Sequence, residues 1–174
     1  MPSRTYNVLF LCEGNSARSI IAEAYLNSLH SHLHGFSAGA EPRGLIHPLA
    51  LDVLHNLKLP TDGLRSKSWD EFASPAAPVM DLIINLCDEP AGEECPTWPE
   101  QPVSAHWGIP DPAIVEGSEV NKHQAFFRTV GYLRRRIDIL VNFRMKHLDR
   151  ITIKRLDDMG KRQADEFDEL EAPG

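Results

Sequence analysis

The sequence predicts an α/β domain, a three-layer sandwich in which a central four-stranded parallel sheet carries helices on both faces. Short apolar runs of strand length alternate along the chain with longer segments of helical periodicity. These runs lack polar alternation, which is typical of strands that are buried on both faces. A length of 174 residues is sufficient for one such domain and its core.

The first strand, loop and helix follow one another closely. Residues 8–11 form a continuous apolar run that ends at Cys12, and a helical pattern begins at Ser19. The apolar positions of that pattern are spaced by four, three and four residues, at Ala22, Leu26, Leu29 and Leu33. This spacing places one apolar face against a sheet. A second short strand is expected over residues 36–39.

Two shorter helices are expected next. Residues 49–57 have helical periodicity, and Pro48 suits the first position of that helix because no amide donor is missed there. Ser68 and Glu71 have the spacing of a capping box, which predicts that a short helix begins at Ser68.

The remaining strands and the longest helix lie in the second half of the chain. Residues 82–86 form a buried strand that leads into Cys87, and residues 103–107 form a weaker fourth strand. The longest helix is expected between residues 118 and 143, with an apolar face made of Phe126, Val130, Leu133, Ile137 and Leu140. Residues 151–159 are expected to add a turn or a helix.

We divide the chain into one catalytic α/β domain, residues 1–145, and a C-terminal helical extension with an acidic tail, residues 146–174. From Asp157 to the end seven residues are acidic, whereas only Lys161 and Arg162 are basic. A solvated tail explains this composition better than an acidic arm that docks a partner.

Charge and cysteine content restrict the class of protein. A formal net charge of −7 argues against general nucleic-acid binding. No apolar run approaches the roughly 20 residues of a membrane span, and the first residues lack the apolar segment of a secretory signal. Three cysteines, an odd number, fit a reducing compartment better than a disulfide framework. We therefore expect a cytoplasmic protein that binds neither nucleic acid nor membrane.

The loop between the first strand and the first helix has the properties of an oxyanion site. Cys12 and Arg18 lie six positions apart and are joined by small and polar residues. A tight loop at a helix N-terminus points backbone N–H groups inward, and the helix dipole favours an anion there. Arg18 can hold two oxygens of a tetrahedral anion at once. The predicted substrate-binding residues are Glu13, Gly14, Asn15, Ser16, Ala17, Arg18 and Ser19.

Cys12 is the predicted nucleophile of this loop. A helix N-terminus and a nearby Arg stabilise a thiolate, which is the reactive form. Ser19, or Ser16, can donate a hydrogen bond to it, and the side-chain amide of Asn15 can hold the loop in shape. We expect Gly14 to supply unusual backbone angles. The alternative is an inert buried cysteine, which the position directly between an apolar strand and an amphipathic helix disfavours.

These residues resemble the low-molecular-weight tyrosine phosphatase superfamily. The resemblance rests on residues 8–12 running into residues 14–19, on Ser37-Ala38-Gly39, and on Asp111-Pro112, and it spans roughly residues 6–143. It implies the fold of that superfamily. Glu13 departs from the uncharged residue expected at its position, and an acid there opposes anion binding unless it faces solvent or pairs with a base.

Asp111 is the predicted general acid, in a loop bracketed by Pro110 and Pro112. In a phosphatase it would protonate the leaving oxygen and then activate water, whereas in an arsenate reductase it would protonate the departing hydroxide. The alternative is an Asp that only begins a turn or caps a helix.

Cys87 and Cys95, eight positions apart, separate these two hypotheses. The arrangement resembles the thioredoxin-coupled arsenate reductases, and the resemblance implies a disulfide cascade. Cys87 would attack the sulfur of an arsenylated Cys12 and release arsenite, and Cys95 would then attack Cys87. Thioredoxin or glutaredoxin would reduce the final disulfide. Alternatively, Cys87 is a core residue and Cys95 an incidental surface thiol, or both bind a metal. Zinc is disfavoured, because two thiols eight positions apart lack the short-spaced ligand pairs of structural zinc sites.

A phosphatase that hydrolyses phosphate monoesters through a phosphocysteine is the second hypothesis. Phosphatases of this superfamily follow Asp-Pro with aromatic residues, whereas Ala113 and Ile114 follow here. Trp98 and Trp107 could supply an aromatic surface instead, but a core or loop-packing role is favoured for each. An anion sensor without turnover ranks third.

No cofactor and no metal are predicted. His30, His32 and His34 alternate along the sequence and are interpreted as a solvated helix end, because alternate positions of a helix cannot all face one ion.

Overall fold

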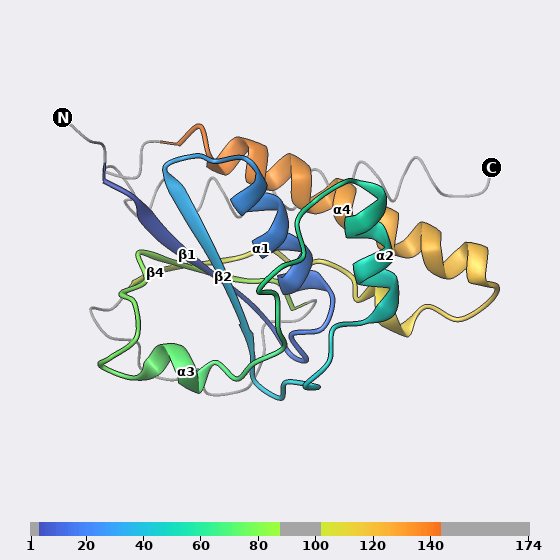
Figure 1. Cartoon of the computed structure of the whole chain (residues 1–174), viewed down its shortest axis with the longest axis horizontal. Coiled ribbons are helices and arrows are strands. Elements are labelled where there is room, and N and C mark those ends of the chain that lie inside the picture. The colour runs from blue at the N-terminus through green and yellow to red at the C-terminus, as the bar shows by residue number, and fades with distance from the viewer. Residues whose placement is uncertain (1–3, 88–101, 144–174) are drawn as a thin grey trace.

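A four-stranded parallel sheet forms the centre of the molecule (Figure 1), with strand order β2-β1-β3-β4. The strands are β1 (Tyr6–Cys12), β2 (Leu33–Gly39), β3 (Leu82–Asn85) and β4 (Val103–His106). The computed structural model of the chain describes residues 4–87 and 102–143. Because all four strands are parallel, their carboxyl ends share one edge, where Cys12 of β1 is paired with Gly39 of β2.

Helices cover both faces of this sheet, as the sequence predicts. α1 (Arg18–Ser28), α2 (Pro48–Asn56) and α4 (Glu119–Leu140) pack in the larger hydrophobic cluster, together with Val8 and Phe10. The short α3 (Asp70–Ala73) packs in the smaller cluster with Leu9 and Leu11, which point to the opposite face of β1. Figure 1 shows α3 across the sheet from the other three helices.

The predicted boundary between the first helix and the second strand is wrong. α1 ends at Ser28, and Leu33 is the first residue of β2 rather than the last position of a helical face. His30 adopts a left-handed backbone with φ 48°, which ends the helix. The histidine run is therefore not a helix end, because His34 stands exposed on β2 between the buried residues Leu33 and Gly35.

Helix starts were predicted with mixed success. Pro48 is the first residue of α2 as expected, and Ser118 caps α4 by accepting a hydrogen bond from the Asn121 N–H at 3.2 Å. The capping box at Ser68 does not form. The Ser68 Oγ accepts from the N–H two residues on, and the Glu71 carboxylate instead makes two hydrogen bonds of 2.8 and 2.6 Å to the Arg65 guanidinium.

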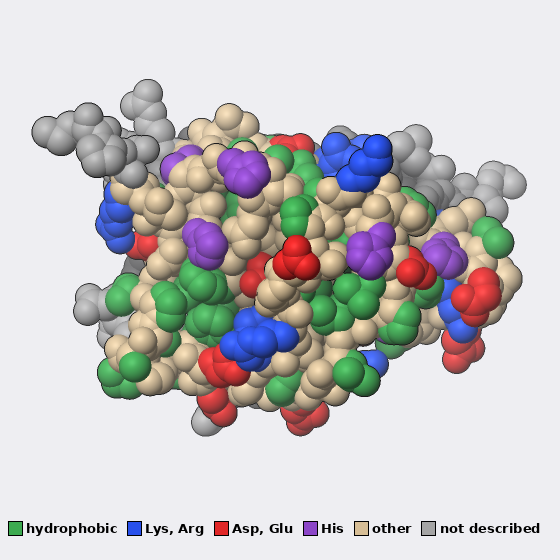
Figure 2. All heavy atoms as spheres, in the orientation of Figure 1, with side chains coloured by type: hydrophobic (Ala, Val, Ile, Leu, Met, Phe, Trp, Pro, Cys, Tyr) green, Lys and Arg blue, Asp and Glu red, His purple; other side chains and the backbone are tan. Residues whose placement is uncertain are grey.

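Some predicted features lie outside the described residues, namely Cys95, Trp98, the possible helix over 151–159 and the tail over 146–174. In the part of the chain that the structure describes, no helix is long and apolar enough to cross a membrane. On the face drawn in Figure 2, Lys and Arg side chains lie scattered among acidic ones.

Candidate active site

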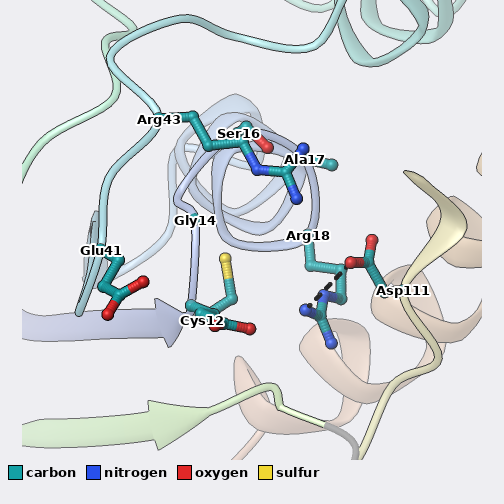
Figure 3. A pocket seen from close by; sticks show the side chains of 9 residues that line it. Cys12, Gly14, Ser16, Ala17, Arg18, Glu41, Arg43 and Asp111 are labelled. Carbon is teal, nitrogen blue, oxygen red and sulfur yellow. Dashed lines mark ion pairs between the residues drawn. The ribbon is translucent and has the colours of Figure 1, made fainter. Parts of the chain in front are cut away.

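A pocket opens at the carboxyl edge of the sheet, over the loop that joins β1 to α1 (Figure 3). Cys12 is the last residue of β1, Arg18 is the first residue of α1, and Asp111 follows β4. Most of the predicted site residues line it, and so do two residues that were not predicted, Glu41 and Arg43. The full lining consists of Cys12, Glu13, Gly14, Ser16, Ala17, Arg18, Glu41, Arg43 and Asp111. The parallel topology thus brings residues from three segments around one thiol.

The loop owes its curvature to Asn15 rather than to Gly14. Asn15 has the left-handed backbone, with φ 43°, and Gly14 is not among the residues with positive φ, so the expectation for Gly14 is wrong. Asn tolerates this conformation because its short polar side chain can bond locally. Gly39 is needed beside the loop, since a Cβ there would lie 2.5 Å from the Glu13 carbonyl oxygen.

A chain of buried hydrogen bonds leads from Lys67 to the thiol. The backbone N–H of Lys67 donates to Asn15 Oδ1 at 2.8 Å, and Asn15 Nδ2 donates to Ser19 Oγ at 2.7 Å. Ser19 Oγ lies 2.9 Å from Cys12 Sγ. Since Lys67 fixes which end of the Asn15 amide faces Ser19, the hydroxyl accepts from Asn15 and its own proton is free to point at the sulfur. This arrangement suits a thiolate at Cys12.

A buried ion pair lies behind this chain. The side chains of Lys67 and Glu23 are 7% and 13% exposed, with Nζ and Oε2 4.0 Å apart. Ser37 Oγ donates to Glu23 Oε2 at 2.8 Å and accepts from Lys67 Nζ at 3.3 Å. Burial raises the pKa of Glu23 and lowers the pKa of Lys67, in each case against the attraction of the partner.

Arg18 is held from behind by backbone carbonyls. Its Nη1 donates to the Ile109 oxygen at 3.0 Å and to the Leu86 oxygen at 3.4 Å. Its Nη2 lies 3.6 Å from Asp111 Oδ2. The buried guanidinium therefore joins the end of β3 to the loop after β4, and it lies at the wall of the pocket.

Asp111 caps a short helix and also faces the pocket. Its Oδ1 accepts from the Ala113 N–H at 2.9 Å and so caps the short 3₁₀ helix Pro112–Ile114. Its other oxygen faces Arg18 in the pocket, and the side chain is 21% exposed. The cap holds one carboxylate oxygen and leaves the other directed at the site.

Cys87 lies half-buried just beyond β3 and packs against the cluster that contains Cys12. Burial raises the pKa of its thiol above the ordinary value, and the nearby positive charge of Arg18 opposes that effect. The charge of Cys12 raises the pKa of Cys87 further, and a backbone hydrogen bond from Glu13 lowers it. These interactions place Cys87 beside the oxyanion loop, whereas Cys95 lies outside the described residues.

Three residues of this neighbourhood were not found by sequence reasoning. Glu41 and Arg43 line the pocket, and Lys67 orients Asn15. The signal that could have found the first two is their position just after Ser37-Ala38-Gly39, at the carboxyl end of the neighbouring strand. Glu13 is exposed to solvent but also lines the pocket, so its charge still acts on an anion there.

Trp107 is 1% exposed and packs against Phe10 with ring centroids 6.3 Å apart. This contact places it in the core, as the sequence analysis favoured, and not at the pocket. Among the described residues, no three His, Cys, Asp or Glu side chains gather as a metal site would require.

A parallel sheet with a thiol and a guanidinium at the two ends of a strand-to-helix loop defines a thiol-based oxyanion-binding α/β domain. The profile of the low molecular weight phosphotyrosine protein phosphatase family matches residues 7–150. The chain belongs to this family.

Known relatives within the family carry a more specific description. Arsenate reductases of Bacillus subtilis (strain 168) and Bacillus licheniformis are 34% and 36% identical to this chain over 124 residues, which make up 71% of this chain and 85% of each relative. The crystal structure of an arsenate reductase from Archaeoglobus fulgidus has a TM-score of 0.64 and 27% identity, and the match covers 78% of this chain and 99% of that one.

A thioredoxin-dependent arsenate reductase of Corynebacterium glutamicum is also similar. It has a TM-score of 0.57 and 25% identity, and the match covers 80% of this chain and 65% of that one.

Proposed function

We propose that this protein is an arsenate reductase in which Cys12, Cys87 and Cys95 act in sequence. The observation that carries the proposal is the second thiol, Cys87, which lies beside the Cys12 loop at the end of the adjacent strand β3. Hydrolysis of a phosphate ester needs only one thiol, whereas reduction of arsenate needs a second thiol to supply electrons. The arsenate reductases among the relatives support the same conclusion.

The first step is attack of the Cys12 thiolate on arsenate in the pocket. A sulfur–arsenic bond forms, and one arsenate oxygen leaves as water after it takes a proton from Asp111. Arg18 neutralises charge on the remaining oxygens. The hydrogen bond that the Ser19 hydroxyl makes with Cys12, at 2.9 Å, holds the sulfur in its reactive form.

In the second step the Cys87 thiolate attacks Cys12 Sγ. A disulfide forms, the sulfur–arsenic bond breaks, and its electron pair reduces As(V) to As(III), which leaves as arsenite. Cys95 then attacks Cys87, which releases the Cys12 thiolate and leaves a Cys87–Cys95 disulfide. A thioredoxin-type or glutaredoxin-type dithiol reduces that disulfide, and the thioredoxin-dependent relative favours the former. Such a cycle requires a reducing compartment, so we place it in the cytoplasm.

A phosphatase activity is the second candidate, because the same loop, Arg18 and Asp111 suit a phosphate ester equally well. The described surroundings favour arsenate. Ala113 and Ile114 follow Asp111-Pro112 and offer no ring for an aryl group, and Trp107 is buried in the core. An inorganic anion needs no such surface.

The decisive experiment measures arsenate-dependent NADPH oxidation with thioredoxin and thioredoxin reductase, alongside hydrolysis of an aryl phosphate. Cys12→Ser should abolish both activities, and Cys87→Ser should abolish only arsenate reduction. After arsenate treatment without reductant, peptide mass spectrometry should find a Cys87–Cys95 disulfide in the wild type and a Cys12–Cys87 disulfide in Cys95→Ser. Normal arsenate reduction by Cys87→Ser would rule out the cascade, and aryl phosphate hydrolysis without any arsenate reduction would identify a phosphatase.

A further inference from the structure

Charge around the pocket is unfavourable for an anion unless one additional residue takes part. Three carboxylates, those of Glu13, Glu41 and Asp111, line the pocket, and Arg18 and Arg43 are the cations that line it. Without Arg43 a tetrahedral dianion would meet one guanidinium against three carboxylates and a thiolate. Backbone N–H groups at the start of α1 offset part of this charge, since no side chain caps that helix.

The base of Arg43 is fixed to the oxyanion loop. Its backbone N–H donates to the Gly14 carbonyl at 3.0 Å, and Ser66 Oγ donates to the same carbonyl at 3.3 Å. The Ser66 hydroxyl also accepts from the Gly44 N–H at 3.1 Å. These contacts hold the chain around Arg43 against the loop.

The side chain of Arg43 runs across the face of Gly14. A Cβ on Gly14 would lie 3.0 Å from the Arg43 Nε, 3.2 Å from its Cγ and 3.4 Å from its Cδ. Gly14 therefore leaves the space in which this side chain lies, and a Cβ there would require the Arg43 side chain to shift by a few tenths of an ångström. Figure 3 shows the guanidinium extending over the loop toward the side where Arg18 lies, with Glu41 on the other side of Cys12.

The guanidinium of Arg43 is available for a ligand. The side chain is exposed, and within residues 4–87 and 102–143 it makes no ion pair or hydrogen bond. Its charge also acts on His47, the N-cap of α2, because after burial Arg43 is the largest cause that lowers the pKa of that imidazole. Arg18, by contrast, is buried and held by carbonyls.

We propose that Arg43 is a second anion-binding residue, which closes over a tetrahedral oxyanion held in the loop from Cys12 to Arg18. The proposal deepens the proposed function and rests on it for the identity of the anion. Arg18 holds the anion from the buried side and orients it for attack. Arg43 covers it from the solvent side, offsets the carboxylates of Glu13 and Glu41, and favours a fully ionised inorganic anion over a bulky ester.

The test uses protection of Cys12 by inorganic phosphate, which does not depend on turnover. Cys12 of the full-length protein is alkylated with iodoacetamide at increasing phosphate concentrations, and the rate is followed on the Cys12 peptide by mass spectrometry. Arg43→Ala should raise the phosphate concentration for half-protection about tenfold, which corresponds to about 1.4 kcal/mol. Arg43→Lys should retain part of the effect. The control Arg4→Ala removes the same charge before the amino end of β1 and should leave protection unchanged.

A second measurement replaces iodoacetamide by the anionic iodoacetate. The ratio of iodoacetate to iodoacetamide rates at Cys12 should fall in Arg43→Ala, and added salt should reduce the difference from the wild type because Arg43 is exposed. If arsenate is the substrate, KM for arsenate should rise about tenfold with little change in kcat. Equal phosphate protection and equal reagent ratios in wild type and Arg43→Ala would overturn the role of Arg43. If the wild type does not reduce arsenate, only the proposed function is overturned, and the role of Arg43 in binding phosphate still stands or falls with the protection assay.

Discussion

Removal of one partner of the buried pair behind the oxyanion loop tests how that loop is supported. Lys67→Met keeps most of the apolar stem but removes the ammonium that faces Glu23 across 4.0 Å. The carboxylate of Glu23 then remains buried, with Ser37 as its hydrogen-bond donor. A buried charge without its counter-charge is strongly destabilising, whereas removal of both charges is often close to neutral.

The size of this effect follows from the geometry. Two unit charges 4.0 Å apart attract by about 4 kcal/mol at an effective dielectric constant of about 20. We therefore expect Lys67→Met to lower the free energy of unfolding by about 3–4 kcal/mol at pH 7. For a chain of this size that corresponds to a fall in Tm of about 10 °C. The double variant Glu23→Gln with Lys67→Met should lose only about 1 kcal/mol.

The loss in Lys67→Met should also depend on pH. Burial raises the pKa of Glu23 in the folded protein, and loss of Lys67 removes the main attraction that opposes this rise. Above pH 4.5, the ordinary pKa of Glu, the unfolded chain releases the proton of Glu23 whereas the folded chain still binds it. The free energy of unfolding therefore falls as pH rises through and above that value. Lys67→Met should accordingly recover much of its lost stability near pH 5.

Urea unfolding followed by circular dichroism at pH 7 and pH 5 measures both effects. The double variant is the matched control, because it lacks the charge of Lys67 but does not leave Glu23 ionised. If Lys67→Met unfolded at the same urea concentration as the wild type, or lost equal stability at both pH values, the assignment of a buried ion pair would be refuted.

Three further predictions concern the site. Burial raises the pKa of Cys87, so the fraction of Cys87 that is thiolate grows as pH rises above neutrality. Arsenite release in a single turnover should therefore accelerate by up to about tenfold between pH 7 and pH 8. A rate that does not change with pH would contradict attack by Cys87. Gly39→Ala should destabilise the fold by about 1–3 kcal/mol and slow alkylation of Cys12, because the new Cβ would lie 2.5 Å from the Glu13 carbonyl and the loop must shift. Its control in a urea titration is Gly131→Ala in α4, where a Cβ meets nothing within 4 Å and should stabilise the helix by about 1 kcal/mol; equal effects of the two variants would exclude the close approach. Arg18→Lys should lower kcat about 100-fold or more, because an ammonium cannot bond the carbonyl oxygens of Leu86 and Ile109 and also donate to the anion. A near-normal kcat would show that the positive charge alone is sufficient.

Local sequence was sufficient for the oxyanion loop and most of the sheet. Cys12 and Arg18 belong to one continuous strand, loop and helix, so their proximity depends on few residues. Asp111 and Cys87 could be placed at the same edge because parallel strands end together. The helical pattern is wrong at Leu33. This residue lies four positions after Leu29, which fits a helix by coincidence, but it begins β2, and His30 with its left-handed backbone separates β2 from α1.

Packing between distant segments accounts for what could not be predicted. Ser68 and Glu71 have capping-box spacing, but the Glu71 carboxylate pairs with Arg65 instead, and sequence spacing cannot rank these two partners. Gly14 was expected to carry the unusual backbone angles, yet Asn15 carries them because Lys67 and Ser19 bond its side chain. Gly14 instead leaves space along which the Arg43 side chain lies.

The sequence by itself determined the fold class and the position of the loop between β1 and α1, because these depend on periodicity and adjacency. It also contains the cysteines on which the proposed reductase rests. Only the tertiary structure revealed that Glu41 and Arg43 line the pocket and that Lys67 lies behind it. These residues reach Cys12 because β2 pairs with β1 and because the segment after α2 returns to Gly39. Such pairings join residues far apart in the chain, and local patterns do not encode which strand will lie beside which.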